Sequence, residues 1–307
     1  MKKDFLWSLM AIMIAMTMSV SFISCNDDDD NNISHDIDYV SALTGIIDRE
    51  SGLRLKSLGD YTVYYNSEGL FDSIAHTDDY LDDYAFRYGP DKITYTHGYF
   101  FDISRELSVK YNKSGWMSSY ESKETGDWSP SKVEAYWNGT GTATFTYDNE
   151  GHLTSITRSG AETGLELKGP YASSWLEEIT LTWENGLLKE MKYNETGFEN
   201  ARTWSGVYTF SYDTEYVNKY KQWVYIYIFG QYNDIFLPYL GLLGVGPGKL
   251  PSTVIFTFTD KYGKVGDSGT ETYPCSYEFN ADGSVAKANG WEYTYEYATG
   301  SKTKIHR

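Results

Sequence analysis

The residues with the clearest binding chemistry are three aromatics in segments that look like loops. Trp128 falls in Glu124–Pro130, and Tyr171 and Trp175 fall in Lys168–Trp175, two stretches that contain Gly, Ser and Pro. A flat ring can stack on the face of a sugar, although large rings more often close the end of a hydrophobic core. We therefore name Trp128, Tyr171 and Trp175 as candidate ligand-stacking residues, with core closure as the alternative.

Two short motifs imitate catalytic or phosphate-binding sites but lack the residues around them. Gly266-Asp-Ser-Gly269 resembles the nucleophile tetrapeptide of trypsin-like proteases, but Thr and Glu follow it and no His stands in a matching context. A Ser without a positioned base is a poor nucleophile, so we interpret the motif as a turn. Gly244–Lys249 has neither the spacing nor the Ser/Thr of a phosphate loop. We predict no catalytic residue.

The sequence also offers no pattern typical of a metal or cofactor site. The five His residues are scattered without ligand spacing. The acidic stretch around Asp78 and Asp83 lacks a coordinating loop pattern, although carboxylates suit Ca²⁺. We therefore expect neither metal nor cofactor. Paired carboxylates could hydrolyse glycosides, but a sequence alone does not give their separation.

A repeated hairpin must position these side chains. In 143–156, Ala, Phe and Tyr alternate with Thr, a turn of Asp-Asn-Glu-Gly follows, and apolar residues resume. Alternation with period two is typical of a strand with one buried face, and Asn, Asp and Gly suit a tight turn. Similar units surround the glycines at 69, 115, 151, 186, 263 and 283.

The fold predicted from these units is all-β. With 29 Tyr, 14 Phe and 9 Trp, the composition favours strands, and the irregular glycine spacing favours a meander over a propeller or solenoid. We expect an antiparallel meander of hairpins that forms a large curved sheet or a barrel-like domain over 55–300. One short helix is expected near 235–244, where Pro238 and several glycines forbid a longer one.

The first residues have the features of a signal peptide. Lys2 and Lys3 precede an apolar run from Phe5 to Val20, which leads to Phe22-Ile-Ser-Cys25. That tetrapeptide resembles the bacterial lipobox, which implies removal of 1–24 and lipid attachment at Cys25, with fatty acyl chains such as palmitate. Ordinary secretion with an accidental Cys is the alternative.

The next segment is strongly acidic. Four consecutive Asp residues occupy 27–30, and their repulsion predicts a solvated tether at the start of 25–54. A transitional segment follows, and its residues from 33 to 58 could form a short helix or a first strand. The tract is similar to the one that directs Bacteroidetes lipoproteins to the outer face of the outer membrane. The net charge of −17 disfavours nucleic acid as a partner. Residues 301–307 form a basic tail.

A wider resemblance rests on three segments of the C-terminal third. Leu237-Pro-Tyr-Leu-Gly-Leu-Leu-Gly244, Lys249-Leu-Pro-Ser252 and Val254-Ile-Phe-Thr-Phe258 resemble a family of uncharacterised Bacteroidetes lipoproteins. This resemblance implies a porin-like fold, a domain of unknown function and no catalytic residues to transfer. The hairpin units are similar to that family over most of the chain after the signal peptide.

Together these features predict a cell-surface lipoprotein of the outer membrane, anchored by lipid on Cys25. We expect a module that binds a glycan or a protein and catalyses no reaction. An enzyme is the less favoured interpretation. The alternatives are a hydrolase that degrades glycans and a true outer-membrane barrel. The barrel is disfavoured because Thr, Ser and Lys occupy the second face of strands such as 142–147, where lipid would require apolar side chains.

Overall fold

The computed structural model describes most of the chain after residue 45. It describes residues 46–48, 51–76, 83–89, 92–98, 102–128, 135–166, 169–197, 202–213, 215–223, 243–262 and 265–298. All of these belong to one compact unit, Ile37–Arg307. The predicted signal peptide and Cys25 lie outside the described residues. The described part contains no helical segment with the length and hydrophobicity of a transmembrane span.

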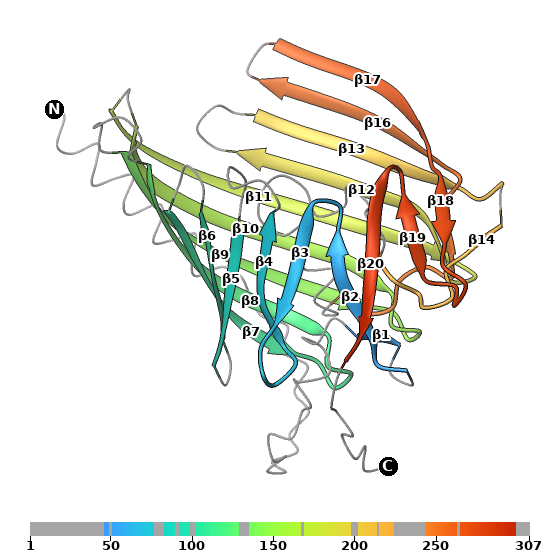
Figure 1. Cartoon of the computed structure of the whole chain (residues 1–307). Helices are drawn as coiled ribbons and strands as arrows, with labels where there is room; N and C mark the ends of the chain where they lie inside the picture. Colours follow the sequence, from blue (N-terminus) through green and yellow to red (C-terminus); the bar gives the residue numbers. More distant parts are fainter. Residues whose placement is uncertain are drawn as a thin grey trace, which may run out of the picture. The chain divides into compact units, whose positions relative to one another are not determined.

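The fold is all-β, as predicted (Figure 1). The first ten strands are β1 (Ile46–Asp48), β2 (Leu53–Leu58), β3 (Tyr61–Tyr65), β4 (Phe71–His76), β5 (Asp83–Gly89), β6 (Lys92–Gly98), β7 (Asp102–Tyr111), β8 (Met117–Trp128), β9 (Ala135–Tyr147) and β10 (Leu153–Glu166). The others are β11 (Gly169–Glu184), β12 (Leu187–Gly197), β13 (Arg202–Ser211), β14 (Tyr216–Val217), β15 (Lys249–Leu250), β16 (Thr253–Tyr262), β17 (Val265–Pro274), β18 (Tyr277–Phe279), β19 (Val285–Ala288) and β20 (Trp291–Tyr297).

Eighteen strands form one antiparallel sheet, and β14 and β15 form a separate pair. From β2 to β13 each strand pairs with the next, and β13 then pairs with β16 and β16 with β17. On the other side β2 pairs with β20, β20 with β19 and β19 with β18. Among the described strands, β17 pairs only with β16, and β18 only with β19.

Two boundaries differ from the expectation. The sheet begins before residue 55, because β1 pairs with β2 inside the transitional segment, which forms a first strand there and not a short helix. The helix expected at 235–244 falls almost entirely outside the described residues, and Leu243 and Gly244 at its end are in neither helix nor strand.

The turns explain why the hairpin recurs. In the turn after β9, the Asp148 carboxylate accepts hydrogen bonds from the backbone N–H groups of Glu150 and His152 at 2.9 Å each. Gly151 completes the turn with φ of +88°. The same pattern recurs at Asn66 and Asn112, where the side-chain oxygen accepts from residues two and four positions later. The predicted turn glycines at 69, 115, 186 and 283 also have positive φ, the conformation that glycine adopts without steric cost.

Successive hairpins are joined by what we call linking hydrogen bonds. In each, an aromatic side chain within one residue of the end of a strand donates to a backbone carbonyl oxygen near the start of a strand in a neighbouring hairpin. These bonds join Tyr147 to Met117 at 2.8 Å, Trp183 to Leu153 at 2.8 Å and Tyr212 to Leu188 at 2.6 Å. Burial raises the pKa of Tyr147 and Tyr212, so both phenols remain protonated donors.

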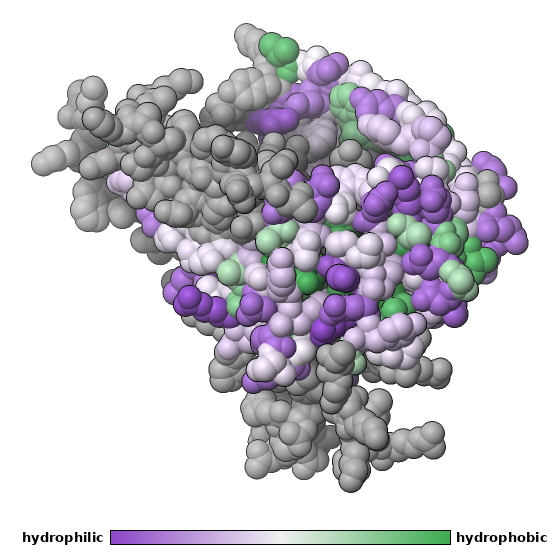
Figure 2. All heavy atoms as spheres, viewed as in Figure 1, coloured by the Kyte–Doolittle hydropathy of each residue, from purple (hydrophilic) through white to green (hydrophobic). Residues whose placement is uncertain are grey.

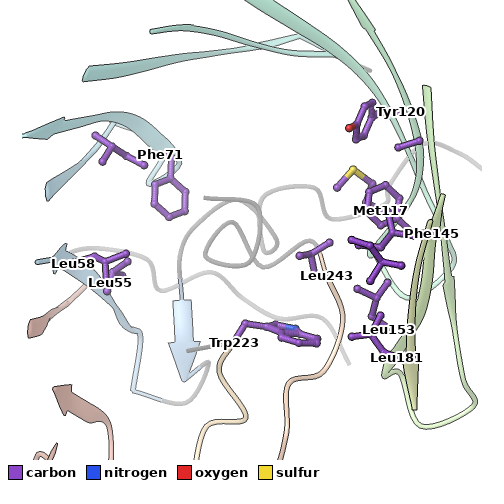
Figure 3. Close-up of a cluster of buried hydrophobic side chains, with 14 of the residues drawn as sticks. Leu55, Leu58, Phe71, Met117, Tyr120, Phe145, Leu153, Leu181, Trp223 and Leu243 are labelled. Atoms are coloured by element: carbon purple, nitrogen blue, oxygen red, sulfur yellow. The ribbon is translucent and has the colours of Figure 1, made fainter. Parts of the chain in front are cut away.

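The core lies between two parts of this sheet. Figure 3 shows Leu55, Leu58 and Phe71 on one side and Met117, Phe145 and Leu153 on the other, with Trp223 and Leu243 between them. Phe71, Met117, Leu153 and Leu243 are fully buried. Burying a side chain of this size contributes roughly 1.5–3 kcal/mol. The Trp223 and Leu243 side chains therefore occupy the interior between the two parts of the sheet.

Candidate functional site

A polar cavity lies on the inward face of β7 to β12, beside the hydrophobic core. It encloses about 300 Å³. Its charged lining consists of two arginines and four glutamates, namely Arg105, Glu124, Arg158, Glu162, Glu177 and Glu195. Charged side chains are rarely found on the inward face of a sheet unless they are paired or serve a function. The cavity is therefore the strongest candidate site in the described part of the chain.

Strand alternation places these residues on one face. On β10, Ile156 is buried in the core and Arg158 follows two positions later, so both point inward. The register then aligns Arg158 with Glu177 on β11, and Glu177 with Glu195 on β12. The first part of the cavity is thus a row of charges across three neighbouring strands.

Arg158 and Tyr193 hold this row together. Arg158 donates two hydrogen bonds to Glu177, one from Nε at 2.7 Å and a shorter one from Nη2. Glu177 and Glu195 are directly opposite each other, an arrangement that is repulsive for like charges. The Tyr193 hydroxyl donates to Glu195 at 2.5 Å and lies 3.5 Å from Glu177. Burial, the Glu177 charge and the bond to Glu195 all raise the pKa of Tyr193, so its proton stays on the phenol.

The second part of the cavity contains two glutamates on either side of a glycine. Gly139 on β9 pairs with Glu124 on β8 and with Glu162 on β10. A Cβ atom added to Gly139 would lie 3.6 Å from the Glu124 Cβ and 3.9 Å from the Glu162 Cβ. Because Gly139 has no side chain, a trough remains between the two carboxylates.

The two glutamates beside the trough have different partners. Glu124 accepts a hydrogen bond from the indole Nε1 of Trp137 at 3.2 Å and lies 3.5 Å from Arg105 Nε. Glu162 accepts from the Ser173 hydroxyl at 2.9 Å. One carboxylate therefore faces a cation, whereas the other has a neutral donor.

Of the three predicted stacking residues, Trp175 lines the cavity. It lies in the middle of β11 rather than in a loop, so the predicted loop 168–175 is wrong. Its cross-strand partner is Gly160, where a Cβ would come within 2.7 Å of the indole ring. The ring therefore occupies space that only a glycine on β10 leaves open.

Tyr171 is not among the described residues that line the cavity, and the structure does not place the Trp128 side chain. The Tyr171 ring packs over Gly164, where an added Cβ would lie 2.6 Å from it. Trp128 is the last residue of β8, not a loop residue, and its side chain is outside the described part of the structure. Both strands therefore extend further than the loop-like composition of these segments indicated.

The sequence interpretation missed the charged residues. Arg158 and Glu177 occupy inward positions that the hairpin pattern assigns to apolar side chains, and both are buried. An Arg and a Glu at positions where Ile, Leu or Phe is expected are the signal that could have revealed them. The arrangement can accept and donate hydrogen bonds to hydroxyl groups beside an aromatic face.

The protease-like tetrapeptide and His152 do not belong to the described lining of the cavity. Asp267 and Ser268 are exposed on β17, so the tetrapeptide is in a strand and not in the predicted turn. His152 stacks on Trp183, with 4.3 Å between ring centroids, and its Nδ1 lies 3.0 Å from Asp148. Within the described ranges, no three His, Cys, Asp or Glu side chains gather in a cluster able to hold a metal ion.

No family model matches this chain, and no curated protein matches it significantly. Among solved structures, it is similar to a porin-like protein from Bacteroides uniformis, with a TM-score of 0.44 and 17% sequence identity. The match covers 77% of this chain and 90% of that one.

Proposed function

We propose that this protein is a lipoprotein held on the outer membrane by acyl chains on Cys25, and that its β domain binds a saccharide at the cell surface. The observation that carries the binding proposal is the cavity in which Trp175 meets six charged side chains. Carboxylates and arginines can bond to sugar hydroxyls, and the indole can stack on the sugar ring. A concave site of this size suits a ring rather than a protein surface, since protein interfaces are broad.

The outward face of the sheet supports a position in water. Thr142 on β9 and Ser159 on β10 are 3.2 Å apart through their hydroxyls, and Thr257 and Thr270 repeat the pattern at 3.1 Å on β16 and β17. The face seen in Figure 2 is mainly hydrophilic to neutral, with small separate hydrophobic areas. A wall facing lipid would need an apolar band instead. This favours an anchored domain over a membrane-spanning barrel.

The binding proposal is tested with a glycan array followed by calorimetry on the purified full-length chain. Trp175→Ala should abolish binding, and Gly139→Ala should weaken it at least tenfold by filling the trough with a methyl group. The control is Tyr64→Ala, since Tyr64 is 50% exposed on β3 and is not part of the cavity lining. If no glycan binds, or if the three variants behave alike, the proposal is wrong.

A glycan-degrading hydrolase is the second candidate, favoured by one observation. Glu124 and Glu162 flank an open trough, and glycosidases use two carboxylates on either side of the bond they break. Chromatography of bound oligosaccharides after incubation distinguishes the candidates. Unchanged oligosaccharides support binding alone, whereas shortened products that disappear in both Glu124→Gln and Glu162→Gln support hydrolysis.

The anchor is tested by metabolic labelling with a clickable fatty acid. Cys25→Ser should remove the label, whereas Cys275→Ser should retain it because Cys275 lies between β17 and β18, inside the folded domain. Absence of label on the unmodified protein would contradict the anchor.

A further inference from the structure

Among the residues that the structure describes, the cavity lining carries more negative than positive charge. Its lining includes four glutamates but only two arginines. Arg158 already bonds to Glu177, and Arg105 lies against Glu124. Each arginine therefore has a carboxylate beside it, which leaves Glu162 and Glu195 as the excess.

These two glutamates have neutral hydrogen-bond donors. Glu162 accepts from the Ser173 hydroxyl, and Glu195 accepts from the Tyr193 hydroxyl. Arg202 on β13 interacts with the Glu195 charge through space. Its hydrogen bonds, however, go to Asp260, from Nε at 3.1 Å and from Nη2 at 2.9 Å. A ligand that enters the cavity thus meets two carboxylates to which no cation of the described segments is bonded.

We propose that the cavity accepts uncharged saccharides and rejects acidic ones, and that Glu162 and Glu195 set this selection. The inference rests on the proposed saccharide binding. Carboxylates accept hydrogen bonds from sugar hydroxyls well, because an ionised acceptor forms stronger bonds than a neutral one. A carboxylate on the ligand would instead face like charges in a partly enclosed site, where charge interactions are stronger than in water. Rejection by repulsion is a common basis of specificity.

The selection is tested with matched probes. Gluco-, galacto- and manno-oligosaccharides are each titrated into the purified chain before and after oxidation of their primary hydroxyls to carboxylates, at low salt. We expect every neutral probe that binds to lose at least about 100-fold in affinity on oxidation. Raising the salt concentration should reduce the ratio of neutral-probe affinity to oxidised-probe affinity, because screening weakens charge repulsion.

Glutamine variants assign the selection to residues. Glu162→Gln and Glu195→Gln keep an oxygen that can accept from Ser173 and Tyr193, and each should reduce the ratio to about tenfold. Glu278→Gln is the control, since Glu278 is exposed on β18 and should leave the ratio unchanged. Denaturation midpoints equal to that of the unmodified protein confirm that the variants are folded.

The outcomes separate the two proposals. If no probe binds in either form, the proposed saccharide binding is wrong, and the proposed selection against acidic saccharides is then wrong as well. If neutral and oxidised probes bind equally, saccharide binding stands and the selection is wrong. If the ratio stays at 100-fold in both glutamine variants, the assignment to Glu162 and Glu195 is overturned.

Discussion

Replacing Gly160 by Ala tests how the sheet makes room for Trp175. The added Cβ would lie 2.7 Å from Trp175 Cζ2 and 2.9 Å from the Thr140 carbonyl oxygen. The indole could rotate away, but the oxygen belongs to the backbone of β9 and cannot. Overpacking of this kind costs about 1–3 kcal/mol. The loss of glycine flexibility in the unfolded chain offsets roughly 0.5–1 kcal/mol, so we expect a net loss of up to about 2.5 kcal/mol.

Gly139→Ala is the matched control. Gly139 is also a strand glycine on the inward face, but the nearest atoms to an added Cβ are at 3.6 and 3.9 Å, which is ordinary contact. We therefore expect Gly139→Ala to be neutral or to stabilise the fold by up to about 1 kcal/mol. Any loss of ligand binding in this variant would come from the filled trough and not from unfolding.

Urea denaturation followed by circular dichroism measures both variants, with tryptophan fluorescence as a second probe. A shift of midpoint at constant slope gives the change in unfolding free energy. The fluorescence of folded Gly160→Ala should also differ from that of the unmodified protein, because the Trp175 ring is displaced. The reasoning is refuted if the two variants have equal stability, or if Gly139→Ala is the less stable one.

Three further predictions concern the row of charges in the cavity, the turn at Asp148 and one linking hydrogen bond. Arg158→Met should lower the unfolding free energy by about 3–5 kcal/mol in urea, since it leaves Glu177 buried without its cation; a loss below 1 kcal/mol would contradict this. Asp148→Ala should cost about 1 kcal/mol through the lost turn acceptor, whereas Asp148→Asn should retain most of the stability. Burial raises the pKa of Asp148, but the hydrogen bonds that its carboxylate accepts lower it by more, so the pKa lies below the ordinary value of 3.8. The stability that the Asp148 carboxylate contributes is therefore complete above pH 3.8 and is lost as the pH falls through the lower pKa of the folded state. The asparagine variant should lack this acid dependence in melts between pH 2 and 5. Tyr147→Phe should cost about 1–2 kcal/mol in thermal melts, because the Met117 carbonyl loses its linking hydrogen bond, and an unchanged melting temperature would show that the bond is dispensable.

The sequence predicted the fold well because the hairpin is specified locally. Alternation, an Asn or Asp acceptor and a glycine with positive φ are all contained within about ten residues, and the structure has them at Asn66, Asn112 and Asp148. The lengths of β8 and β11 were missed because their outer halves contain Gly, Ser and Thr, which resemble loop composition although the period of two continues.

The cavity could not be predicted in the same way. Its charges come from strands whose register depends on pairing between residues far apart in sequence, and a shift of one residue would turn Arg158 and Glu177 to the opposite face. Trp175 was identified by residue type alone. That Gly160 lies beneath it, and that Glu195 lies beyond Glu177, follows only from the assembled sheet.

The linking hydrogen bonds bear on how such a protein could grow. Each bond joins a side chain of one hairpin to the backbone of a neighbouring one, so the acceptor imposes no demand on the identity of its residue. A duplicated hairpin would contain its own aromatic donor, and a backbone carbonyl oxygen of the neighbouring hairpin could accept its hydrogen bond. Duplication of a hairpin would therefore lengthen this sheet by a whole unit without requiring a particular residue at the acceptor position.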